Sequence, residues 1–82
     1  MINLGDQVFV NKTHYSSYVE KGLVEGICQT PVDLQKYFNE DHPFYSTYFS
    51  WITNNKTIYV VHLENNIGRA GFLGKELSIV EK

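Results

Sequence analysis

The stretch that decides the fold prediction runs from Tyr48 to Leu63 and reads YFSWITNNKTIYVVHL. Aromatic and β-branched residues dominate both of its halves, and such residues suit the pleated, half-buried surface of a β-sheet. Asn54 and Asn55 lie between the halves, and asparagine tolerates the positive φ angle of a tight hairpin turn. We therefore predict a β-hairpin in this stretch. Because an isolated hairpin is only marginally stable, the remaining segments must cover it.

The composition describes one small globular domain, residues 1–82. Of these 82 residues 43% are hydrophobic and 15% are aromatic, which fits a folded protein with a small core. The formal net charge of −2 does not favour nucleic-acid binding. Cys28 is the only cysteine, which excludes an intramolecular disulfide and suits a reducing cytosol. With no signal-peptide pattern and no apolar run of membrane-spanning length, we expect a cytoplasmic protein without membrane contact.

Two strands are predicted in the N-terminal part of the chain, over residues 7–10 and 21–28. The first strand places Val8 and Val10 on the same face, because side chains alternate along a strand. The second strand contains two glycines, which often mark a bulge or the corner of a small barrel. The polar segment 12–18 between them is predicted to be a loop.

One short helix is predicted to begin at Thr30 and Pro31. Threonine is a good N-cap, proline suits the first helical position, and Asp33 completes a capping-box pattern. Leu34 and Phe38 lie four residues apart, so they can share one buried face.

The C-terminal part predicts a bent strand over 67–72, a tight helical turn over 73–77 and a last strand over 78–81. The predicted fold class is therefore mainly β, with about five antiparallel strands and one short inserted helix. Short curved strands with internal glycines favour a small barrel over a flat sheet.

Two segments carry a family resemblance. GDQVFV (5–10), followed by GLVEGI (22–27), resembles the opening of SH3-like barrels, which often read Gly-Asp-x-Val-x-Val and then Gly-x-Val-x-x-Ile. The strand around 59–61 and the final LSIV (77–80) fit the same pattern. With its helix between strands, the chain resembles the small YorP-like proteins of bacteria and their phages over most of its length. The resemblance implies an SH3-like barrel and a phage or prophage setting, and it implies no site.

No motif in the sequence names a reaction, so we expect no enzyme activity, no catalytic residue and no cofactor. The histidines, His14, His42 and His62, lack the spacing of metal ligands, and we expect no metal site. No nucleophile motif surrounds Cys28, and free cysteine is usually buried. The late glycines are not followed by the Lys-Ser or Lys-Thr of a phosphate-binding loop.

The aromatic residues are the best functional lead, because they exceed what so small a core can bury. Exposed tyrosine and tryptophan are typical anchors of protein interfaces. The alternative is that the helix packs over these aromatic residues and hides them. Arg69 could pair with a carboxylate, stack on an aromatic ring or serve as an ordinary surface charge. The predicted binding residues are Tyr15, Tyr18, Tyr45, Tyr48, Trp51 and Arg69.

The preferred function is a small protein-interaction module, in a phage or prophage setting, that binds a host protein through this aromatic surface. Two alternatives stay open. One is a binder of single-stranded nucleic acid that stacks bases on the same aromatic rings, although the charge does not favour it. The other is a structural subunit that self-associates, since the sequence leaves the oligomeric state open.

Overall fold

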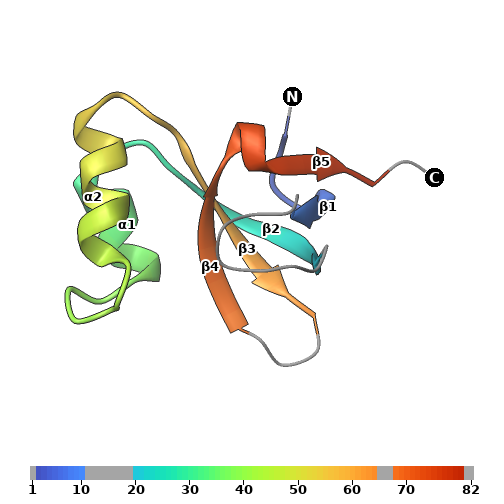
Figure 1. Cartoon of the computed structure of the whole chain (residues 1–82), viewed down its shortest axis with the longest axis horizontal. Helices are drawn as coiled ribbons and strands as arrows, with labels where there is room; N and C mark the ends of the chain where they lie inside the picture. The colour runs from blue at the N-terminus through green and yellow to red at the C-terminus, as the bar shows by residue number, and fades with distance from the viewer. Residues whose placement is uncertain (1, 11–19, 65–67, 81–82) are drawn as a thin grey trace.

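The structure, a computed structural model, describes residues 2–10, 20–64 and 68–80. These residues form an α+β fold in which a five-stranded antiparallel sheet, ordered β4-β3-β2-β1-β5, carries two α-helices (Figure 1). The helices lie together in a layer of their own, well away from β1 and β5 (Figure 1). The elements in chain order are β1 (Gln7–Val10), β2 (Glu20–Cys28), α1 (Pro31–Tyr37), α2 (Tyr45–Thr53), β3 (Ile58–Leu63), β4 (Gly68–Leu73), the 3-10 turn η1 (Gly74–Glu76) and β5 (Leu77–Ile79).

The sheet confirms the five antiparallel strands of the prediction but is open. Strands β4 and β5 stand at its two edges, and no backbone pairing among the described residues joins them into a closed barrel. The short strands, the 3-10 turn before the last strand and the glycine-associated irregularity in β2 lie where the sequence predicts them. The predicted loop over 12–18 and the last residue of the predicted final strand fall outside the described residues.

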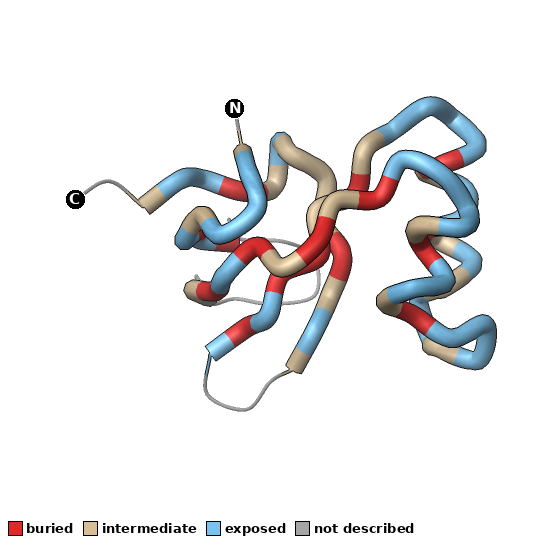
Figure 2. Tube along the Cα trace, turned by 180° about the vertical axis from the view of Figure 1, so that it is seen from behind, coloured by how far each residue is buried: buried red, intermediate tan, exposed pale blue. Residues whose placement is uncertain are grey.

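Strand β3 separates two hydrophobic clusters, because its successive side chains point to opposite faces. Ile58 and Val60 face the helices, whereas Val61 and Leu63 face the other side of the sheet. Figure 2 shows buried residues both along the strands and within the helical layer. The buried members of the helix-side cluster are Cys28, Leu34, Phe38, Tyr48, Ile52, Ile58 and Val60. The buried members of the strand-side cluster are Val8, Val10, Val24, Val61, Leu63 and Leu77.

Helix α1 begins as the sequence predicts. The Thr30 hydroxyl oxygen accepts a hydrogen bond from the Asp33 amide at 3.2 Å, and Pro31 occupies the first turn. The Asp33 carboxylate accepts from the Gln29 amide at 3.1 Å, and this bond lowers the pKa of Asp33. Leu34 is fully buried, as its place on the apolar side of the helix requires.

The segment predicted to form the first strand of the hairpin is instead helix α2, and that prediction is wrong. Tyr48 and Ile52 lie four residues apart on one side of the helix and are 4% and 6% exposed. Their burial in the helix-side cluster outweighs the β-propensity of the segment, which spans only about 1 kcal/mol per residue. The prediction of a single helix is therefore corrected to two.

Asn54 and Asn55 end helix α2, so they do not form a hairpin turn. Asn55 adopts a φ of 63°, the left-handed conformation that the sequence predicts for an asparagine here. The Asn55 amide donates to the Ile52 carbonyl at 3.0 Å, and the Lys56 amide donates to the Trp51 carbonyl at 2.9 Å. These two bonds form a Schellman motif, which satisfies carbonyl groups at the end of the helix.

Gly26 allows α1 to approach β2 closely. A Cβ atom at this position would lie 2.4 Å from Cζ of Tyr37 and 2.7 Å from its Cε1. The bulge in β2 falls between Val24 and Gly26, so the glycine both accompanies the irregularity and leaves room for the ring.

We predict that Gly26→Ala lowers the free energy of unfolding by about 1–3 kcal/mol, because the added methyl group overlaps the Tyr37 ring. Urea unfolding of the wild type and the variant measures the loss. The control is the same substitution in a Tyr37→Ala background, where it should cost less than half as much. An equal cost in both backgrounds would contradict the packing argument.

Candidate functional site

The structure separates the residues that the sequence groups into one aromatic surface. Tyr48 lies in the helix-side cluster, so its predicted role as an exposed anchor is wrong. Tyr45 and Trp51 are half-buried and pack against the same cluster. Tyr15 and Tyr18 lie outside the described residues.

Tyr48 joins the helical layer to the sheet. Its hydroxyl oxygen accepts a hydrogen bond from the Gly71 amide of β4 at 3.1 Å, and this bond is buried. Its ring lies 4.8 Å from the Phe38 ring and 5.6 Å from the Trp51 ring, measured between centroids. A Cβ atom at position 71 would come within 3.2 Å of Cζ of Tyr48, so the ring occupies the space that glycine leaves.

Arg69 makes both of the specific contacts that the sequence allows it. Its Nε donates to the Glu25 carboxylate, and its Nη1 donates to the Tyr37 carbonyl at 3.2 Å. The guanidinium also lies 5.6 Å from the centroid of the Tyr37 ring, within the range of a cation–π contact. These contacts join β4 to β2 and to the end of α1, so the guanidinium serves the fold.

The residues of α2 that point away from the sheet define a surface that we call the α2 face. A helix advances by about 100° per residue, so the residues opposite the buried Tyr48 and Ile52 lie on one outward side. Phe49 is 41% exposed on this side, and the hydroxyl residues beside it are exposed as well. The α2 face consists of Ser46, Phe49, Ser50 and Thr53, and the half-buried Tyr45 borders it.

The α2 face has an aromatic edge and a hydroxyl strip. The rings of Tyr45 and Phe49 stack with centroids 6.3 Å apart and an interplanar angle of 28°. The Thr53 hydroxyl donates to the Ser50 carbonyl at 2.9 Å, so this polar group already has a partner within the helix. The face is therefore aromatic along one side and carries uncharged hydroxyl groups along the other.

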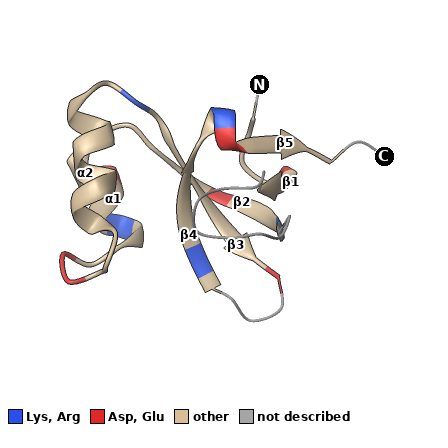
Figure 3. Ribbon diagram, viewed as in Figure 1, with Lys and Arg blue, Asp and Glu red and all other residues tan. Residues whose placement is uncertain are grey.

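The α2 face carries no charge. No Asp, Glu, Lys or Arg occurs anywhere in residues 42–55. Figure 3 shows α2 without any charged residue, while α1 and the sheet carry charges of both signs. This run without charged residues can be read from the sequence. Combined with the spacing of a helix it identifies the α2 face, whereas the assignment of a strand does not.

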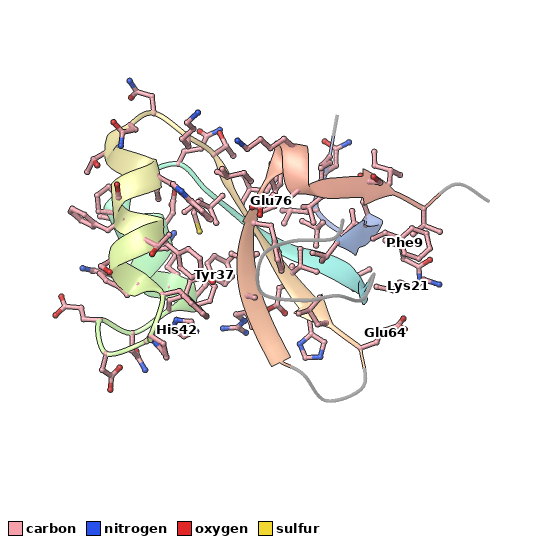
Figure 4. All side chains as sticks on the ribbon, viewed as in Figure 1. Phe9, Lys21, Tyr37, His42, Glu64 and Glu76 are labelled. Atoms are coloured by element: carbon pink, nitrogen blue, oxygen red, sulfur yellow. The ribbon has the colours of Figure 1, made fainter. Side chains whose placement is uncertain are left out.

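Two exposed apolar side chains of the sheet lie opposite charged or titratable residues. Phe9 is 38% exposed on β1, but it pairs across the sheet with Lys21. Figure 4 places the Phe9 and Lys21 side chains close together at the end of the sheet farthest from the helices. Leu23 is opposite His62 in the β2–β3 pairing. Each of these two side chains therefore lies beside a residue that can carry a positive charge, whereas α2 has no such residue.

The described cations do not line a groove along the α2 face. Lys36 lies 3.8 Å from the Asp33 carboxylate, and Arg69 is paired with Glu25. Two further lysines border a separate, open cavity of about 260 Å³ between the start of β3 and η1. That cavity is lined by Lys56, Thr57, Tyr59, Leu73, Gly74 and Lys75.

Cys28 is fully buried in the helix-side cluster. Burial, with a contribution from the nearby charge of Asp33, raises the pKa of Cys28 to about 11. The reactive thiolate form is therefore disfavoured at neutral pH. Across residues 2–10, 20–64 and 68–80, no three His, Cys, Asp or Glu side chains gather as a metal site. In the same part of the chain, no helix has the length and apolar character needed to cross a membrane.

Comparisons with known proteins assign no family to the chain. No protein-family model, curated protein or solved structure matches it. The functional argument therefore depends on the geometry of α2.

We predict that Tyr48→Phe lowers the free energy of unfolding by about 1–3 kcal/mol, because the buried Gly71 amide loses its acceptor. Urea unfolding measures the change. Tyr45→Phe is the matched control, since it removes a hydroxyl from a half-buried ring on the same helix; we expect it to change stability by less than about 0.5 kcal/mol. Equal effects of the two substitutions would show that the Tyr48 hydroxyl does not join the layers.

Proposed function

We propose that this protein is a small protein-interaction module that binds its partner through the α2 face. The observation that carries the proposal is an exposed helix without charged residues that presents a stacked aromatic pair. The cores of protein interfaces are enriched in aromatic residues and depleted of charged ones. A solvent-facing helix surface, by contrast, ordinarily carries charged and polar side chains.

Burial of the α2 face costs little desolvation free energy. A partner that covers this face removes no charge of the α2 face from water, and burial of an unpaired charge is the largest such cost. The Thr53 hydroxyl keeps its hydrogen bond to the Ser50 carbonyl in the complex. The Phe49 ring supplies apolar area, and its contact with Tyr45 limits the side-chain entropy lost on binding.

The resemblance of the sequence to SH3-like barrels suggests the biological context of this module. The strand-side cluster has buried residues from β1, β2, β3 and β5, and partly buried residues of β4 pack against it. One hydrophobic cluster shared by all five strands of this open sheet supports an SH3-like organisation. With the YorP-like resemblance of the sequence, we place the module in a bacterial or phage context, where a host protein is the partner.

The two alternative functions make different demands on the surface. A binder of single-stranded nucleic acid needs a basic groove beside its aromatic platform. Lys36 is in an ion pair, and Lys56 and Lys75 border the cavity beside η1, so the described lysines form no continuous basic groove in support of this alternative. Self-association would use the same α2 face, and the experiment below separates it from binding to another protein.

The test is affinity capture from a bacterial lysate, with Phe49→Lys compared with Phe9→Lys. The two phenylalanines have nearly equal exposure, 41% and 38%, but lie on α2 and β1. We expect the wild type and Phe9→Lys to retain one defined protein, and Phe49→Lys to bind it at least about tenfold more weakly, as for an interface hot spot. Titration of the purified partner by calorimetry gives the affinities.

Three results would contradict the proposal. A captured protein that binds all three forms equally does not use the α2 face. Nucleic acid that elutes with salt supports the alternative of base stacking. A concentration-dependent dimer that Phe49→Lys abolishes, without a captured protein, supports self-association.

A further inference from the structure

His42 closes the turn that leads into α2. Its ring nitrogen Nδ1 accepts a hydrogen bond from the Phe44 amide at 3.1 Å, and Phe44 is the N-cap residue of the helix. The backbone of His42 takes part too: its amide donates to the Asn39 carbonyl at 2.9 Å, and its carbonyl accepts from the Tyr45 amide at 3.0 Å. The Phe44 side chain supplies no cap, so the His42 ring bonds to the backbone where Asn or Asp often does.

The imidazole is held in place by three aromatic rings. Its centroid lies 5.0 Å from that of Phe38, 5.8 Å from that of Tyr48 and 6.0 Å from that of Phe44. These rings come from the end of α1, from α2 and from the turn itself. In Figure 4 the label of His42 stands at the lower end of the helical layer, toward the sheet. These three contacts thus hold the imidazole ring beside the Phe44 amide.

Only the neutral imidazole can accept this hydrogen bond. A neutral ring has one acceptor nitrogen, whereas in the protonated ring both nitrogens are donors. Protonation would therefore set a ring N–H against the Phe44 N–H, and the bond at 3.1 Å would be lost. Histidine is the side chain that ordinarily changes charge between about pH 5 and 8.

Aromatic rings surround the His42 imidazole, and the carboxylates of its own turn lie at the surface. The rings that face it from α1 and the turn, Phe38 and Phe44, carry no charge. The Tyr48 hydroxyl of α2 is bonded to the Gly71 amide. Glu40 and Asp41, the carboxylates of the same turn, are exposed.

We propose that His42 is a proton-sensitive latch on the start of α2. Uptake of one proton from solvent breaks the bond to the Phe44 amide and releases the first turn of the helix, where Tyr45 borders the α2 face. The effect on partner binding depends on the proposed function, whereas the latch is a property of the free protein. Acidification therefore loosens the α2 face and weakens binding.

The direct test is an NMR titration of the ¹⁵N-labelled wild type from about pH 8 to 5. We expect the Phe44 amide proton to move upfield as the His42 ring nitrogens titrate, and its hydrogen exchange, corrected for intrinsic pH dependence, to rise about five- to tenfold. A Phe44 amide that does not change while the His42 ring titrates overturns the proposal. This titration needs no variant and no partner.

A pair of variants isolates the histidine. Asparagine at position 42 provides an oxygen that can accept the Phe44 N–H and does not titrate, so His42→Asn should abolish the pH dependence and keep the helix. His62→Asn, on the exposed side of β3, is the matched control and should keep the pH dependence. Trp51, the only tryptophan, lies on α2 and gives a fluorescence readout for both. Persistence of the transition in His42→Asn overturns the latch.

Partner binding at about pH 7.5 and 5.5 then tests the link to the proposed function. We expect wild-type affinity to fall at the lower pH and the affinity of His42→Asn to stay constant. If the NMR transition is present but no partner binds the α2 face, the proposed function fails and the latch stands. If a partner binds but the Phe44 amide does not respond to pH, the latch fails and the proposed function stands.

Discussion

The hydrogen bond from the Gly71 amide to the Tyr48 hydroxyl fixes the helical layer on the sheet. It is buried, and it gives an acceptor to a backbone donor of an edge strand. Glycine at position 71 is part of the same contact, because a side chain there would meet both Ile58 and the Tyr48 ring. Once Tyr48 is held in this place, helical geometry turns Phe49 outward and Ile52 inward. The burial of Tyr48 and Ile52, with this hydrogen bond at its centre, thus sets which aromatic residues of α2 face solvent.

Much of the fold can be predicted from the sequence where local signals and tertiary packing agree. The strand at Val8 and the helix start at Thr30 follow from alternation and capping, and the structure has both. The stretch from Tyr48 to Thr53 is different, because aromatic and β-branched residues favour a strand while the spacing of Tyr48 and Ile52 also fits a helix. The packing of both residues against β3 decides between them, and no local propensity contains that information.

The sequence indicates which segment carries the candidate surface, but not which of its residues are exposed. An excess of aromatic residues points to this segment as a candidate surface, but the strand assignment places Tyr48 on that surface and leaves Phe49 out of it. Arg69 is the converse case: its contacts with Glu25 and with the Tyr37 ring join segments far apart in the chain, which sequence spacing cannot specify. The run over 42–55 contains no Asp, Glu, Lys or Arg, and the helical assignment shows that part of it forms a surface. With that assignment, the same residues that build the core also determine an uncharged outer side, and His42 controls how that side begins.

Hydrogen exchange of the Gly71 amide in the native protein tests the central contact most directly. An amide on the free side of an edge strand exchanges quickly unless another group accepts its hydrogen bond. The Tyr48 hydroxyl is that acceptor. We therefore expect the Gly71 amide to be protected from exchange to a degree comparable with the amides of β3, which is paired on both sides in the sheet. Exchange of this amide at the rate of an unstructured peptide would show that Tyr48 does not join α2 to the sheet, and the α2 face would lose its structural basis.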